Sequence, residues 1–380
     1  MLTLNALVHA PAHLLLSLLS GPHHHRCSST STDHAGRSSP MAASARIAVV
    51  GDVHDDWDLE EDTKALQVLQ PDLVLFTGRC LPPYSVLFVV FSLAFVCDFG
   101  NENVELVQSV ASLKFPKAVI LGNHDAWKSQ HFSSKKKKNG VQLQLESLGE
   151  DHVAFKRLDF PALKLSVVGG RPFSCGGEHL FRKNLLSARY GVHNMDESAN
   201  RIYNAAVGSP EEHLVIFLAH NGPKGLGSNL NDICGKDWVP GGGDHGDPDL
   251  EKAICLFKER TKIQTPLVVF GHMHKELAHG NGLRKMIVVG ADKTIYLNAA
   301  IVPRVQRLNP KQGASNRSFV NEETSFVPES GGTTRAFTLV QVLDSRVHRI
   351  TETWVSVVGD EATLQEEQIL FDRDQSCFNR

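Results

Sequence analysis

The chain has 380 residues, of which 42% are hydrophobic and 21% are charged, and its formal net charge is −3. These proportions are typical of a globular protein and exclude a disordered, collagen-like or coiled-coil chain. Because so small a net charge provides no broad basic field, we expect no nucleic acid as a general polyanion partner.

Residues 1–45 have the composition of a leader. They contain eight serines and two arginines but a single acidic residue, Asp33. Such a composition favours a transit peptide, so we predict import into an organelle, a plastid (chloroplast) or a mitochondrion, with plain disorder as the alternative. Translation from Met41 would instead give a shorter, cytoplasmic product.

The cysteines and the apolar runs of the sequence indicate in which cellular environment the protein works. The seven cysteines include no C-x-x-C pair. Their odd number fits neither a disulfide framework nor a structural zinc site, which favours a reducing compartment. No apolar run reaches the ~18 to 20 residues that a membrane-spanning helix needs, so we expect no membrane partner.

Short apolar runs that end in glycine or a polar cluster recur along the chain, a pattern of buried strands. They begin at Arg46, Asp72, Lys117, Lys164, His213 and Pro266. Helical patterns lie between them at residues 58–70, 103–113 and 247–262. This alternation predicts an α/β fold. We expect a single domain over residues 46–357 and a C-terminal tail over residues 358–380.

Two hairpin-like pairs follow Lys275, with turns at residues 290–293 and 344–345. Hairpins place antiparallel strands beside the parallel ones. The sheets should therefore be mixed.

An apolar insertion interrupts this pattern at residues 79–97. Nine of its eleven residues from Val86 to Val96 are Val, Leu or Phe, whose codons carry T at the second position. A translated pyrimidine tract has this composition, so our leading interpretation is a retained intron or a faulty gene model. The alternative is a real apolar strand or hairpin, which the same residues also favour.

Polar residues with metal-binding side chains follow four of the predicted strands. They are Asp52, His54, Asn123, His124, His220, His272 and His274. Open α/β sheets place their ligand crevice at the carboxyl ends of the strands, so these side chains should converge. On an extended segment, residues two apart point to the same side, as for Asp52 and His54. Mixed oxygen and nitrogen ligands suit Zn, Mn or Fe.

The order of the blocks GDVH, GNHD and GHMH resembles the calcineurin-like metallophosphoesterase superfamily. The resemblance covers residues 46–357 and implies a sandwich of two mixed β-sheets flanked by helices (αββα). The strings DFGNE, VVGGRPFS and HNGPKGLG look like a cyanobacterial and plant subgroup of undefined substrate. Those relatives run directly into DFGNE, without the insertion.

The resemblance also implies a dinuclear metal centre. Asp52, His54 and His274 would bind one metal, and Asn123, His220 and His272 the second. Asp98 would bridge the two, and His124 would be the proton donor. The implied reaction is hydrolysis of a small phosphomonoester or phosphodiester by a metal-bridging hydroxide. Because the insertion directly precedes Asp98, the alternative is a catalytically impaired metal-binding or scaffold protein.

Three further residues are weaker candidates for substrate contacts. Arg171 follows a predicted strand, and its planar guanidinium is suited to binding phosphate. Asp244 and His245 lie in the glycine-rich loop GGGDHGDPD, and loops often carry binding residues.

Deletion of residues 79–97, which joins Gly78 to Asp98, should raise both soluble yield and metal-dependent phosphoesterase activity severalfold. Loop closure is not the reason, since ~19 residues cost only about 2.6 kcal/mol plus a constant. An uncharged β-prone run is the problem, because it favours aggregation. A Gly/Ser segment of equal length should recover the yield as well. Equal yield and activity for the native and deleted forms would contradict the prediction.

Overall fold

The computed structural model describes residues 44–78, 102–278, 282–308 and 331–376. Contacts divide the chain into residues 1–41 and residues 42–380, and every described residue belongs to the second unit. The predicted leader up to residue 43 and the apolar insertion, together with Asp98, lie outside the described residues. None of the helices in these ranges has the length and apolar character needed to cross a membrane.

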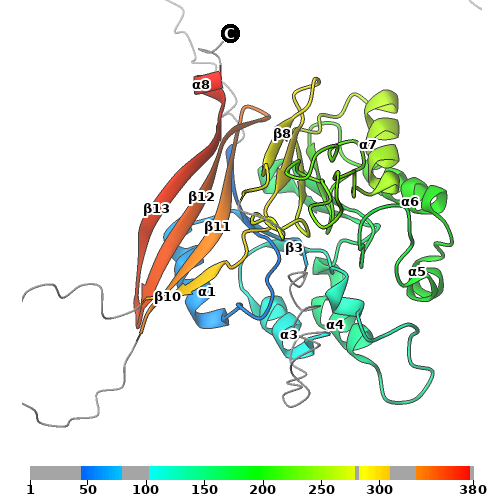
Figure 1. Cartoon of the computed structure of the whole chain (residues 1–380), viewed down its shortest axis with the longest axis horizontal. Helices are drawn as coiled ribbons and strands as arrows, with labels where there is room; N and C mark the ends of the chain where they lie inside the picture. Colours follow the sequence, from blue (N-terminus) through cyan, green and yellow to red (C-terminus); the bar gives the residue numbers. More distant parts are fainter. Residues whose placement is uncertain (1–43, 79–101, 279–281, 309–330, 377–380) are drawn as a thin grey trace, which may run out of the picture. The chain divides into compact units, whose positions relative to one another are not determined.

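Two mixed β-sheets form the centre of the fold, as predicted (Figure 1). The first contains, in spatial order, β13 (Glu361–Asp372), β12 (Arg346–Val358), β11 (Thr333–Leu343), β1 (Ser44–Val50), β2 (Leu73–Phe76) and β3 (Lys117–Val119), with β10 (Val305–Arg307) paired to β11. The second contains β4 (Arg157–Phe160), β5 (Leu165–Gly169), β6 (Leu214–Leu218), β7 (Leu267–Phe270), β9 (Ile295–Asn298) and β8 (Ile287–Val289). The six strands predicted from apolar runs and both predicted hairpins are confirmed.

Helices cover the outer faces of the sheets. They are α1 (Leu59–Leu69), α3 (Val104–Ser112), α4 (Gly140–Leu148), α5 (Lys183–Tyr190), α6 (Met195–Val207), α7 (Pro248–Arg260) and the short α8 (Arg373–Ser376). Helix α1 packs against β12 and β13, and α6 packs against β5 and α7. The three helices expected from the sequence, α1, α3 and α7, are confirmed.

Both faces of the central strands are buried, which explains why their sequences are continuously apolar. In β1, Ile47 and Val49 belong to the cluster that also contains Ile216 and Val269 of the second sheet. The alternate residues Ala48 and Val50 pack in the cluster that includes the helices. The two-residue period of a strand therefore sends successive side chains into two different cores.

The expected C-terminal tail is wrong for residues 361–372. These residues form β13, which pairs antiparallel with β12 and is the outer strand of the first sheet. Most of its side chains are exposed, including those of Glu366 and Glu367. Polar side chains on an edge strand protect a sheet from further pairing. The same composition is typical of a C-terminal tail, which is why the sequence pattern favours a tail over a strand here.

A buried ion network joins α1 to the β10–β11 region. Asp62 is fully buried and accepts hydrogen bonds from Arg304 Nη2 at 2.5 Å and Arg335 Nη1 at 2.6 Å. It also accepts one from the backbone N–H of Asp58 at 3.0 Å. Arg304 and Arg335 are 2% and 3% exposed. Asp62 is the carboxylate paired with Arg304, whereas Arg335 is paired with Glu61 as well.

Asp62→Ala should lower the free energy of unfolding by about 3 to 5 kcal/mol, because it leaves two buried arginines without their shared carboxylate. Urea denaturation measures the change. Glu60→Ala is the matched control, since Glu60 forms an exposed ion pair with Lys64 on the same helix, and its loss should cost less than about 1 kcal/mol. Similar costs for the two variants would show that the network contributes no more than a surface pair.

Candidate metal centre

The carboxyl ends of strands from both sheets meet at one edge of the sandwich. Strands β1, β2 and β3 are mutually parallel, as are β5, β6, β7 and β9. The polar residues predicted to bind metal follow β1, β3, β6 and β7, and all of them except His272 and His274 are less than 9% exposed. The structure thus brings together Asp52, His54, Asn123, His124, His220, His272 and His274.

The backbone at this edge is not extended, contrary to the spacing argument made from the sequence. Asp52, His54 and His272 have φ values of 42°, 50° and 68°. Non-glycine residues rarely adopt this left-handed region, and such strain concentrates at functional sites. Asp52 and His54 share one side because the chain turns sharply at both residues.

Glycines allow the motif segments to approach each other. A Cβ atom at Gly271 would lie 2.6 Å from Asp52 Oδ1, and one at Gly51 would lie 1.9 Å from the carbonyl oxygen of Ala299. Ala299 follows β9 of the second sheet. These glycines therefore permit the two sheets to meet at the site.

Asp52, His54 and His274 form the first group of candidate ligands. One ligand atom from each lies within 4.8 Å of the others. The Asp52 carboxylate accepts the backbone N–H of His272 at 3.1 and 3.0 Å. His274 Nε2 is buried without a hydrogen bond in the described part of the chain and lies 3.5 Å from Asp52 Oδ2. A buried imidazole nitrogen facing a carboxylate fits a metal cation between them.

Asn123, His220 and His272 form the second group. His220 Nδ1 lies 2.6 Å from the carbonyl oxygen of Thr77, an acceptor, so Nδ1 carries the proton. His220 Nε2 then presents a lone pair, yet it lies 2.9 Å from Asn123 Oδ1, another acceptor, and 3.2 Å from His272 Nδ1. Two facing acceptors repel each other, and a cation between them would remove the conflict.

Burial sets the protonation of both groups in the absence of metal. It lowers the pKa of His220 and of His274 to about 4 and lowers that of His272 well below its usual range. It raises the pKa of Asp52 to about 8, an effect that the His272 N–H opposes and the nearby Asp125 reinforces. The histidines are therefore neutral and ready to coordinate, whereas Asp52 must lose a proton to do so.

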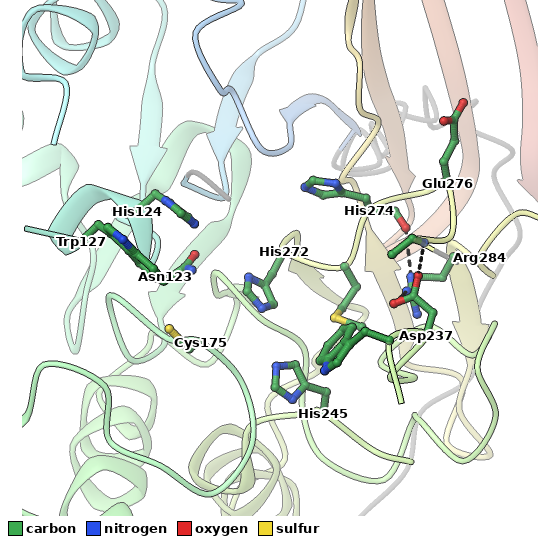
Figure 2. A pocket seen from close by; sticks show the side chains of 13 residues that line it. Asn123, His124, Trp127, Cys175, Asp237, His245, His272, His274, Glu276 and Arg284 are labelled. Atoms are coloured by element: carbon green, nitrogen blue, oxygen red, sulfur yellow. Dashed lines mark hydrogen bonds and ion pairs between the residues drawn. The ribbon is translucent and has the colours of Figure 1, made fainter. Parts of the chain in front are cut away.

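A cavity of ≈ 340 Å³ opens beside these groups (Figure 2). It is lined by Asn123, His124, Trp127, Cys175, Asp237, Trp238, His245, His272, Met273, His274, Glu276, Ala278 and Arg284. The predicted proton donor, His124, stacks on Trp127 with ring centroids 4.4 Å apart and an interplanar angle of 9°. Its imidazole is thereby held at the cavity wall beside the candidate ligands.

Of the three weaker candidates for substrate contacts, only His245 lines the cavity. Arg171 is 2% exposed and forms ion pairs with Asp247 and Asp249, both at 2.8 Å. It does not line the cavity, so the substrate contact expected for it from the sequence is not supported. Asp244 accepts the backbone N–H groups of Gly225 and Gly246 and orders its own loop.

His245 does line the cavity and stacks on His272, with ring centroids 5.7 Å apart. Trp238 contacts His245 at 4.8 Å and was not singled out from the sequence. The available signal was its place in a glycine-rich polar segment, where a large aromatic residue has no core to join.

One family profile and two solved structures are similar to this chain. The profile of the family described as calcineurin-like phosphoesterase matches residues 45–276. A crystal structure of a conserved uncharacterised protein from Streptococcus pneumoniae TIGR4, described as a predicted phosphoesterase, has 12% identity and a TM-score of 0.28 over 86% of this chain and 98% of that chain. A structure of PhoD has 10% identity and a TM-score of 0.40 over 87% and 72%. No curated protein gave a significant match.

Metal affinity should rise with pH by about tenfold per unit up to about pH 8 and then level off, because the cation must displace the Asp52 proton. Since the folded pKa lies above the unfolded value, the contribution of Asp52 to metal-free stability should fall as pH rises from about 4 to about 8. Competition with a chelating dye measures the affinity. The pH dependence should flatten in Asp52→Asn, and an unchanged slope in that variant would assign the proton to another group.

Proposed function

The chain belongs to the calcineurin-like phosphoesterase family, and we propose that it hydrolyses a small phosphomonoester or phosphodiester with two transition-metal ions at the candidate centre. The observation that carries the proposal is the set of buried ligand atoms that face one another at the strand ends. The Asp52 carboxylate faces His274 Nε2, and His220 Nε2 faces Asn123 Oδ1. Both arrangements support binding of cations.

Each group of side chains would hold one metal. Asp52, His54 and His274 would bind the first, and Asn123, His220 and His272 the second. The predicted bridging carboxylate, Asp98, lies outside the described residues and stays a prediction. Imidazole, amide and carboxylate ligands together suit Mn, Zn or Fe. When bound, such ions polarise phosphoryl oxygens and lower the pKa of a coordinated water towards neutrality.

The protein side chains would supply orientation and the proton. His124 lines the cavity next to Asn123, so it can reach an ester oxygen whose phosphoryl group lies at the metals. In its protonated form it would donate to the leaving oxygen, and its stacking on Trp127 limits rotation of the ring. The hydrogen bond from His220 Nδ1 to Thr77 fixes the tautomer that leaves Nε2 available.

The subgroup and the cellular location are proposed from sequence motifs and composition. The DFGNE and HNGPKGLG strings support membership of the cyanobacterial and plant subgroup, and the Ser-rich leader supports plastid import.

The proposal is tested with p-nitrophenyl phosphate and bis(p-nitrophenyl) phosphate after reconstitution with Mn²⁺ or Zn²⁺. The protein should bind close to two metal ions and hydrolyse at least one ester in a metal-dependent way. Metal binding without hydrolysis of either ester would favour the impaired scaffold instead.

Substitution of the proton donor and substitution of a metal ligand should have different effects on metal binding. His124→Ala should retain metal but lose about 10²- to 10⁴-fold in kcat, because it removes only the proton donor. Asp52→Ala should lose both metal and activity. His131→Ala, at an exposed histidine outside the cavity, is the control and should match the native enzyme. Equal metal loss in His124→Ala and Asp52→Ala would contradict the role given to His124.

A further inference from the structure

The two most exposed tryptophans of the described chain line the same cavity. Trp127 is 44% exposed and Trp238 is 40% exposed, and both belong to the wall beside the candidate metal centre. By contrast, Trp57 is 8% exposed in the core. Large exposed aromatic surfaces that converge on a cavity are characteristic of ligand-binding sites.

Ring contacts connect each tryptophan to the site. Trp127 stacks directly on His124. Trp238 meets the His245 ring at 4.8 Å with an interplanar angle of 86°, and His245 stacks on His272. Figure 2 shows Trp127 and His124 on one side of His272 and Asp237 and Arg284 on the other. A phosphoryl group at the centre would therefore have aromatic surface close to its ester group.

Both loops that carry the tryptophans are held in place. Phe181 lies 5.7 Å from the Trp127 ring, and Arg182 donates a hydrogen bond to the carbonyl of Ala126 at 2.6 Å. On the other loop, Asp237 accepts the backbone N–H of Ala278 at 2.5 Å and pairs with Arg284 at 3.3 Å. Aromatic side chains on fixed loops bind a flat group at little cost in conformational entropy.

The charges of the lining limit the number of phosphates. Arg284 is the cation among the described lining residues, and it is occupied by Asp237 and by the carbonyl oxygens of Asp232 and Gly235 at 2.9 and 2.6 Å. Glu276 adds an exposed carboxylate. This wall offers no available cation to a second phosphate.

Resting on the proposed function, we infer that the substrate carries one phosphoryl group on a planar aromatic group, which packs against Trp238. Trp127 has a separate role, because its stacking on His124 makes it a positioning residue for the proton donor. Trp238 thus determines specificity, whereas Trp127 supports the reaction of every substrate.

The test compares phenyl phosphate with methyl phosphate, which share the phosphoryl group and differ in the aromatic ring. In Trp238→Ala, the ratio of kcat/KM for phenyl phosphate to that for methyl phosphate should fall about tenfold, the size expected for one aromatic contact. Trp238→Phe should restore most of the ratio. Val239→Ala is the matched control, since Val239 is equally exposed on the same loop but does not line this cavity. Trp127→Ala should lower kcat for both esters and leave the ratio unchanged.

Binding of phenylphosphonate, which is not hydrolysed, separates this inference from the proposed function. Quenching of tryptophan fluorescence measures its affinity, which should weaken about tenfold in Trp238→Ala and stay constant in Val239→Ala. Hydrolysis of both esters with an unchanged ratio in Trp238→Ala would overturn the inference and leave the phosphoesterase activity standing. Weakened phenylphosphonate binding without hydrolysis of any ester would support the aromatic site and contradict the proposed function.

Discussion

Repulsion between buried acceptor atoms is the constraint on which the described site depends. His220 Nε2 and Asn123 Oδ1 lie 2.9 Å apart with no proton to share, and the Asp52 carboxylate is buried among imidazoles that burial keeps neutral. Without a cation this arrangement costs energy, because His220 Nε2 and Asn123 Oδ1 are buried as facing acceptors. The surrounding cores of the two sheets must hold the side chains together against that cost.

The polar residues at the strand ends could be predicted from the sequence, because buried strands and their ends follow simple rules. Continuous apolar runs identified the strands, and the polar residues after Val50, Val119, Leu218 and Phe270 identified the edge where they meet. The left-handed backbone at Asp52, His54 and His272 could not be predicted from the sequence, since it arises from contacts between the two sheets rather than from local preference. For the same reason, spacing alone gave the right neighbours for Asp52 through an incorrect backbone geometry.

Arg171 shows a second limit of sequence reasoning. An arginine after a strand near a candidate metal centre has the chemistry of a ligand-binding residue, but here two carboxylates 76 and 78 residues further along the chain are paired with it. Asp247 is also bonded to Ser174 at 2.7 Å, and Asn221 donates to the carbonyl of His245 at 2.8 Å. The arginine therefore acts at a distance, because it fixes the loop that brings His245 to the cavity. Such long-range pairings are set by the folded arrangement, which local composition does not encode.

The glycines and the histidines of the site are constrained for different physical reasons. Gly51 and Gly271 leave no room for a methyl group, so their replacement would push the sheets apart whether or not a metal is bound. His272 and His274, by contrast, are needed only where a metal is used. A descendant that kept this architecture but abandoned catalysis would retain the glycines while its histidines diverged. We therefore expect the glycines of GDVH and GHMH to report the fold, and their acidic and imidazole neighbours to report metal binding.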